Sequence, residues 1–247
     1  MKADLHNTFT IAHRKALESC CVEEMFCLLS AHFEGVTWDQ FIGDLEEKNR
    51  VVLLRRDAAL VGFSTLAVYE SEFEGELVSV VYSGDTIVAP EAWGTTALAR
   101  GWITAVNQLR SQYPRGKYYW LLLTSGFRTY RFLPVFWKEF HPCHAQQIPA
   151  SLRRLRDHLA IERFGTQYDP RRGIVRFRQP QRLRGDLITI PEGRTHDDHV
   201  TFFAAQNPGH ALGDELVCLT ELCDENLTAA GRRMVSPRTN ETLCHHC

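Results

Sequence analysis

The chain has 247 residues, of which 44% are hydrophobic and 23% charged, and its formal net charge is −2. This length can bury a sizeable core, and so small a charge argues against a general electrostatic preference for nucleic acid or a membrane surface. No apolar run approaches the roughly 20 residues that span a bilayer, and the first residues lack the apolar segment of a secretory signal. We therefore expect a cytoplasmic protein whose eight cysteines are reduced.

The first third of the chain predicts two helices followed by strands. Leu17, Cys21 and Met25 recur at four-residue steps, which places them on one apolar face of a helix. Thr37 is a suitable N-cap for a second, shorter helix. The pattern then changes to apolar runs separated by turns, which is typical of antiparallel strands. These runs are Val51–Leu54, Leu60–Val68 and Leu77–Val88.

A helix, a buried strand and a mainly helical C-terminal part come next. Pro90 ends the strand region, and Thr95–Leu109 has the periodicity of an amphipathic helix. Tyr118–Leu123 is apolar throughout, as expected of a strand in the middle of a sheet. The remaining predictions are helices near Arg128–Phe140, Ala150–Arg163, Asp197–Gln206 and Asp214–Met234, and short strands near Ile174–Phe177 and Leu187–Ile190. We expect a core of residues 1–145 and an extension of residues 146–247 packed on it.

The most informative stretch is Asp85-Thr86-Ile87-Val88-Ala89-Pro90-Glu91-Ala92-Trp93-Gly94-Thr95-Thr96-Ala97-Leu98, where a strand turns into a helix. Backbone N–H groups at a helix N-terminus can hold a pyrophosphate, and small residues let it approach closely. The stretch resembles the acyl-CoA loop of the GNAT superfamily of acyltransferases, whose signature is Gln/Arg-x-x-Gly-x-Gly/Ala. Gly94 stands at the first glycine position, whereas Thr96 and Glu91 depart from the signature.

The order of elements from about residue 10 to 140 also resembles that superfamily. The resemblance implies an α/β (α+β) fold with a mixed, largely antiparallel sheet flanked by helices. It also implies that the fourth and fifth strands, here Leu77–Val88 and Tyr118–Thr124, splay apart and hold the pantetheine arm between them, paired in β-like fashion with the fourth strand. The implied residues for acyl-CoA, or for an acyl-phosphopantetheine on a carrier protein, are Ile87, Val88, Trp93, Gly94, Thr95, Thr96, Ala97 and Arg128.

The resemblance also implies candidates for the chemistry of acyl transfer to a small-molecule amine. Such a transfer needs a group that takes a proton from the amine and one that protonates the departing thiolate. In the superfamily the acid is often a tyrosine on the helix after the fifth strand, where Tyr130 stands. Asp85 is the best-placed base, and Glu139 is a further candidate.

Two other functions stay open at this point. The departures at Glu91 and Thr96 favour a non-catalytic GNAT-like module that binds a ligand or partner. A metal-dependent enzyme would use His196, His199 and His210, although Asp197 before an apolar helix is more often a cap. We expect no metal.

An arginine-rich stretch in the extension is the remaining feature that suggests a partner. Such a basic face suits an acidic acyl carrier protein or the phosphates of CoA. Because no aromatic residues alternate with the basic ones, nucleic acid is a weaker expectation. The arginines are Arg153, Arg154, Arg156, Arg163, Arg171, Arg172, Arg176, Arg178, Arg182 and Arg184.

Overall fold

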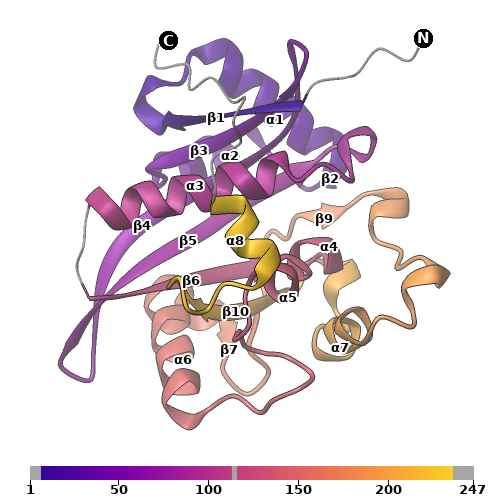
Figure 1. Ribbon diagram of the computed structural model, residues 1–247. Helices are drawn as coiled ribbons and strands as arrows, with labels where there is room; N and C mark the ends of the chain where they lie inside the picture. The colour runs from indigo at the N-terminus through magenta and orange to yellow at the C-terminus, as the bar shows by residue number, and fades with distance from the viewer. Residues whose placement is uncertain (1–6, 113–115, 236–247) are drawn as a thin grey trace.

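A single eight-stranded sheet organises the computed structural model, which describes residues 7–112 and 116–235 (Figure 1). The strand order is β1-β3-β4-β5-β6-β10-β8-β7. The strands are β1 Asn7–His13, β3 Arg50–Arg56, β4 Ala59–Phe73, β5 Glu76–Val88, β6 Lys117–Thr124, β7 Tyr168–Asp169, β8 Ile174–Val175 and β10 Glu215–Glu221. A separate two-stranded sheet pairs β2 Phe33–Glu34 with β9 Arg182–Leu183.

Eight α-helices accompany the sheet in the described residues. They are α1 Ser19–His32, α2 Trp38–Glu46, α3 Ala97–Gln112, α4 Phe127–Tyr130, α5 Phe132–Phe136, α6 Ala150–Phe164, α7 Asp198–Gln206 and α8 Ala229–Val235. Only β5 and β6 run parallel, because α3 carries the chain across the sheet between them; the other described strand pairs are antiparallel. The predicted fold class, a largely antiparallel sheet flanked by helices, is confirmed.

Both faces of the sheet are buried. On one face, Val52, Val81 and Trp120 pack with Trp102 of α3 and Met234 of α8. On the other face two separate clusters form. The strands β5, β6 and β10 pack against α6 in one, and β3 and β4 pack against α1 and α2 in the other. The gap between these two clusters is where the site described below lies.

The main differences from the sequence predictions concern four segments. The Asp214–Met234 helix was wrong: the segment forms strand β10 and the short helix α8, because Leu216–Leu219 is buried on both faces of the sheet and so shows no alternation. Strand β1 was not predicted. The Arg128–Phe140 helix is shorter than predicted and divides into α4 and α5. The predicted strand at Leu187–Ile190 is a bend after a short 3₁₀ helix.

The C-terminal extension shares the sheet of the core. Strand β10 pairs with β6 over six residues, from Leu216 with Thr124 to Glu221 with Tyr119. Beyond β10, Arg100 of α3 donates to the carbonyl of Met234 at 3.3 Å. The extension also reaches the first part of the chain, because β9 pairs with β2, which directly follows α1 (Figure 1).

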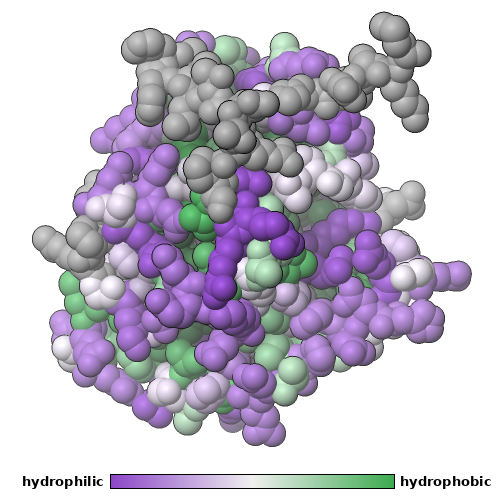
Figure 2. All heavy atoms as spheres, in the orientation of Figure 1, coloured by the Kyte–Doolittle hydropathy of each residue, from purple (hydrophilic) through white to green (hydrophobic). Residues whose placement is uncertain are grey.

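The surface is mainly polar on the face that Figure 2 shows, and apolar side chains appear there as separate small areas. This agrees with the burial of most large apolar side chains in the three clusters. Within the described ranges, no helix is both long and apolar enough to span a membrane.

Candidate active site

The site begins where β5 and β6 separate. The two strands pair from Val78 with Lys117 to Ser83 with Leu122, and the pairing stops there. Strand β6 then ends at Thr124, whereas β5 continues beside β4 up to Val88. From Gly84 to Val88 the side of β5 that faced β6 has no strand partner in the described part of the chain. An exposed strand edge of this kind can pair with the amides of an extended ligand.

A β-bulge at the point of separation turns Asp85 into the gap. Ser83 pairs with Leu66 and Thr86 pairs with Ser64, so Gly84 and Asp85 together face the single residue Thr65 of β4. The Lys48 side chain lies directly against Gly84, where a Cβ would be 2.9 Å from the Lys48 Cε. Asp85, the next residue, is therefore close to Lys48, and the two charges interact.

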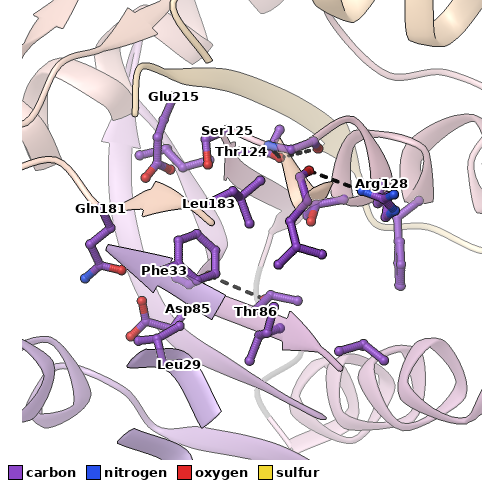
Figure 3. A pocket seen from close by; sticks show the side chains of 18 of the residues that line it. Leu29, Phe33, Asp85, Thr86, Thr124, Ser125, Arg128, Gln181, Leu183 and Glu215 are labelled. Atoms are coloured by element: carbon purple, nitrogen blue, oxygen red, sulfur yellow. Dashed lines mark hydrogen bonds between the residues drawn. The ribbon is translucent and has the colours of Figure 1, made fainter. Parts of the chain in front are cut away.

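A cavity of about 1090 Å³ occupies the gap and contains Asp85. Its lining comes from α1 and α2, from the ends of β6 and α6, and from residues between 177 and 194 of the extension, of which Gln181 and Leu183 are labelled in Figure 3. One end reaches the turn before α3, with Trp93, Gly94 and Thr95. The volume suits a sizeable ligand, since ligand pockets are commonly a few hundred to about 1,000 Å³.

Carboxyl groups gather at the bulge end of the cavity. Burial raises the pKa of Asp85 to about 6, with Lys48 opposing the rise and Asp44 adding to it. Burial raises the pKa of Glu215, the first residue of β10, to about 8, and the nearby Asp85 and Asp44 carboxylates contribute. Burial likewise lowers the pKa of Lys48, although Asp85 favours its charged form. Carboxyls with shifts this large in a cavity are candidates for proton transfer.

Two cations at this end are held by the protein itself. The Lys48 ammonium donates to the Asp44 carbonyl at 2.9 Å and lies 5.2 Å from the centre of the Tyr82 ring. The Arg163 guanidinium pairs with Glu47 at 2.7 Å and stacks on Tyr82 at 3.9 Å. Because Arg163 is already paired, the bulge end keeps an excess of carboxyl groups over free cations.

The α3 end of the cavity is cationic instead. Arg128 stacks on Trp93 with its guanidinium carbon 4.0 Å from the ring centre, and it donates to the Leu187 carbonyl at 3.3 Å. Arg194 also lines the cavity, and burial together with this second guanidinium lowers the pKa of Arg128. Gly94 has a φ of +90°, a backbone conformation that favours glycine.

The residues implied by the acyl-CoA loop fall mostly on this cavity. Those that line it are Ile87, Val88, Trp93, Gly94, Thr95 and Arg128, and the predicted base Asp85 lines it as well. The Thr95 hydroxyl accepts from the Ala97 N–H at 3.1 Å and so caps α3. Thr96 and Ala97 follow it along the chain but are not lining residues, and the exposed Glu91 also lies outside the cavity.

Two proposed catalytic residues lie elsewhere. Tyr130 is fully buried, and its hydroxyl donates to the Pro142 carbonyl at 2.8 Å; the cavity lining does not include it. Glu139 lines a second, smaller hollow of about 250 Å³, together with His141 and Glu221. Neither residue shares the cavity with Asp85.

The sequence did not predict Lys48 or Glu215 as residues of an acyltransferase site. Lys48 belongs to a loop without a motif. Glu215 precedes the apolar run of β10, and the glycine-punctuated loop before it, ending at Gly213, was the signal that a strand-length run begins there.

The arginine-rich stretch is largely paired. Six of its members have carboxylate partners within 4.0 Å: Arg154, Arg156, Arg163, Arg172, Arg176 and Arg184. Asp197 caps α7 as predicted, and it also pairs with Arg131 at 3.0 Å. Over residues 7–112 and 116–235, no three His, Cys, Asp or Glu side chains are placed to hold a metal ion, so His196, His199 and His210 form no such group.

Comparison with known proteins gives matches of fold only. No protein-family model and no curated protein matches the chain. A probable N-acyltransferase of Enterococcus faecalis V583 aligns at 14% identity and a TM-score of 0.39, over 51% of this chain and 31% of that one. The GNAT family N-acetyltransferase YhbS of Escherichia coli, solved in complex with CoA, aligns at 14% identity and a TM-score of 0.40, over 53% and 70%.

A third solved structure, NAA60 of Arabidopsis thaliana in complex with a bisubstrate analogue, aligns at 15% identity and a TM-score of 0.39, over 54% of this chain and 86% of that one. This chain thus spans less than a third of the length of the Enterococcus faecalis protein. The chemistry of the site rests on the geometry of this chain itself.

Proposed function

We propose that this protein is an N-acyltransferase that moves an acyl group from acyl-CoA to a small-molecule amine. One observation carries the proposal: the cavity at the split between β5 and β6 is cationic at the α3 end and rich in carboxyls at the bulge end. A donor with phosphates and an acceptor with an amine would enter such a cavity from opposite ends.

The α3 end suits the donor. The first N–H groups of a helix have no partner within it, and the helix dipole favours a negative charge there. Arg128 and Arg194 add positive charge beside the Gly94 turn. From there, the free edge of β5 leads to Asp85, and pairing with that edge would hold the pantetheine amides. The thioester would then lie near the bulge.

The bulge end suits the acceptor and its activation. Asp85, with a pKa of about 6, is mostly ionised at neutral pH and can accept a proton. As the amine nitrogen attacks the thioester carbonyl carbon, Asp85 takes a proton from that nitrogen, and the carbon–sulfur bond then breaks. Holding the two substrates together supplies most of the acceleration, and no covalent enzyme intermediate is needed.

The test is thermal unfolding with CoA, acetyl-CoA and a long-chain acyl-CoA. A ligand at about 100 times its dissociation constant stabilises the native state by about 2.7 kcal/mol, which shifts the midpoint measurably. Gly94→Glu should abolish the shift, because the new carboxylate repels the phosphates. Gly75→Glu is the matched control, since Gly75 also has a positive φ and open space around it but lies at the β4–β5 turn, away from the cavity.

The outcomes separate the proposal from its rivals. A shift with CoA compounds and turnover with an amine support it. A shift without turnover would point to the binding module instead. If none of the three compounds shifts the midpoint, the CoA proposal is overturned and a carrier-protein donor is left. An acidic carrier protein would have to bind the arginine-rich stretch, in which six of the ten arginines already pair with carboxylates of this chain.

A further inference from the structure

Glu215 is the one cavity carboxyl that comes from the extra strand of the extension. Leu216 pairs with Thr124, which brings Glu215 next to Ser125 at the end of β6, across the split from Asp85 (Figure 3). Its backbone is fixed on the other side by pairing with Val175 of β8. The position of Glu215 is therefore set by two neighbouring strands rather than by a loop.

The Glu215 carboxyl faces the cavity with no protein partner of its own. No hydrogen bond or ion pair of this side chain occurs in the part of the chain that the structure describes, and none occurs for Asp85. The charged groups around Glu215 are the carboxyls of Asp85 and Asp44, with the phenol of Tyr82 beside them.

The cations around this group are engaged elsewhere. The positive charge of Lys48 favours the ionised form of Asp85 and so lowers its pKa. Arg163 pairs with Glu47, and Arg176 pairs with Asp214 at 2.9 Å. Burial, together with the neighbouring Asp85 and Asp44 carboxylates, raises the pKa of Glu215 to about 8, so this group holds its proton at neutral pH, whereas Asp85, with a pKa of about 6, has released its own. Two carboxyls pushed apart in this way suit the roles of acid and base in one reaction.

We propose that Glu215 is the catalytic acid, and that it protonates the departing thiolate while Asp85 accepts the proton of the amine. The proposal rests on the acyl transfer proposed above. The carbon–nitrogen bond forms, the carbon–sulfur bond breaks, Asp85 gains a proton and Glu215 loses one. A proton passed from Asp85 to Glu215 through cavity water restores both groups, and this transfer is favourable because Glu215 is the stronger base. The free thiol and the amide are the only products.

This assignment replaces Tyr130 in that role. The Tyr130 hydroxyl is outside the cavity and donates to the Pro142 carbonyl, so it has no path to a thiolate between β5 and β6. Glu215 needs no rearrangement to face that gap.

The experiment compares two acyl donors that differ in leaving group. Acetyl-CoA releases a basic thiolate, whereas p-nitrophenyl acetate releases a weakly basic phenolate that departs without a proton. Each is assayed with hydroxylamine as acceptor, after subtraction of the rate without protein. Glu215→Gln should lower kcat/KM with acetyl-CoA by about 10²-fold and change it less than about twofold with p-nitrophenyl acetate. Asp85→Asn should lower both.

Glu221→Gln is the matched control, because Glu221 is a half-buried glutamate at the far end of the same strand. It should leave both rates unchanged. Equal losses of Glu215→Gln with both donors, or no loss with either, would overturn the acid role while the acyltransferase stands. If the wild-type protein turns over neither donor and binds no CoA, the proposed function itself fails, and Glu215 with it.

Discussion

Asp85 is the residue on which the proposed chemistry depends most directly. Its carboxyl sits in a β-bulge beside Lys48, and burial raises its pKa to about 6. We expect Asp85→Asn to lower kcat by about 10²- to 10⁴-fold, because the amine then has no proton acceptor. Wild-type activity should rise as pH increases through about 6, when Asp85 ionises, and the variant should lack this limb. Rates measured across pH check both expectations, with the exposed Asp39→Asn on α2 as control.

The same substitution has a predictable effect on stability that excludes unfolding as the cause. The native state holds the Asp85 proton more tightly than the unfolded chain does, since its pKa is raised from 3.8 to about 6. The unfolding free energy therefore falls as pH rises through this range, and ionised Asp85 destabilises the fold above it. Asp85→Asn should raise the unfolding midpoint at about pH 8. A lower midpoint together with lost activity would contradict the catalytic assignment.

At the scale of elements, the short strand β9 fastens the segment that covers the cavity. Arg184 lies just after β9, and its guanidinium donates to the backbone carbonyls of Ser30 and Phe33 at 3.2 and 3.0 Å. Its backbone N–H donates to the backbone carbonyl of His32 at 2.8 Å. These bonds satisfy carbonyls at the C-terminal end of α1, where a helix lacks its own donors. Arg184 thus holds Leu183 and Leu187 over the cavity.

Removal of this guanidinium should loosen the segment. Hydrogen bonds to charged groups contribute about 1.5–3 kcal/mol each, so Arg184→Ala should speed amide hydrogen exchange over residues 182–188 by at least about tenfold and weaken acyl-CoA binding. Arg172→Ala is the control, because Arg172 is more exposed and approaches its partner Asp169 only to 4.0 Å. Equal exchange in the two variants would show that Arg184 does not fasten the cover.

The same scale explains what the sequence could predict. The hairpin of β3 and β4 and the buried strand β6 were predicted because each is a short apolar run bounded by turn residues, and α3 was predicted because its apolar residues recur at the helix period. The turn at Gly94 followed from its place between such elements. The split between β5 and β6 was implied by the resemblance and agrees with the end of pairing at Ser83.

The rest depended on contacts between distant segments. In β10, Leu216 and Cys218 face one core and Val217 and Leu219 the other, so the strand has no period of two and was taken for a helix. Once that strand was misassigned, Glu215 could not be placed beside Asp85. Lys48 is in the site because its side chain lies against Gly84 of β5, a tertiary contact that has no local sequence pattern.

For the whole molecule, the question is whether the core of residues 1–145 and the extension of residues 146–247 fold as one unit. Strand β10 is an interior strand of the shared sheet, and Leu219 exchanges backbone hydrogen bonds with His141 at 2.8 and 2.7 Å as well as pairing with Leu121. Without β10, the buried edge of β6 would be open to pairing with other chains. This arrangement favours a single cooperative unit.

This cooperativity can be tested by substituting a residue of the extension and following the unfolding of the core by tryptophan fluorescence. All five tryptophans lie before residue 146, and Trp102 and Trp120 stack in the core at 4.2 Å. Leu219→Ala removes a buried side chain and should destabilise by about 2–5 kcal/mol. In one cooperative unit, the transition followed by tryptophan fluorescence should shift by that full amount and coincide with the loss of β10 amide protection.

Leu212→Ala, at a leucine of the extension that is 64% exposed, is the control and should leave the tryptophan transition in place. If the tryptophan transition of Leu219→Ala does not move, the extension unfolds independently of the core. Glu215 would then belong to a segment that can unfold and leave the cavity while the core stays folded.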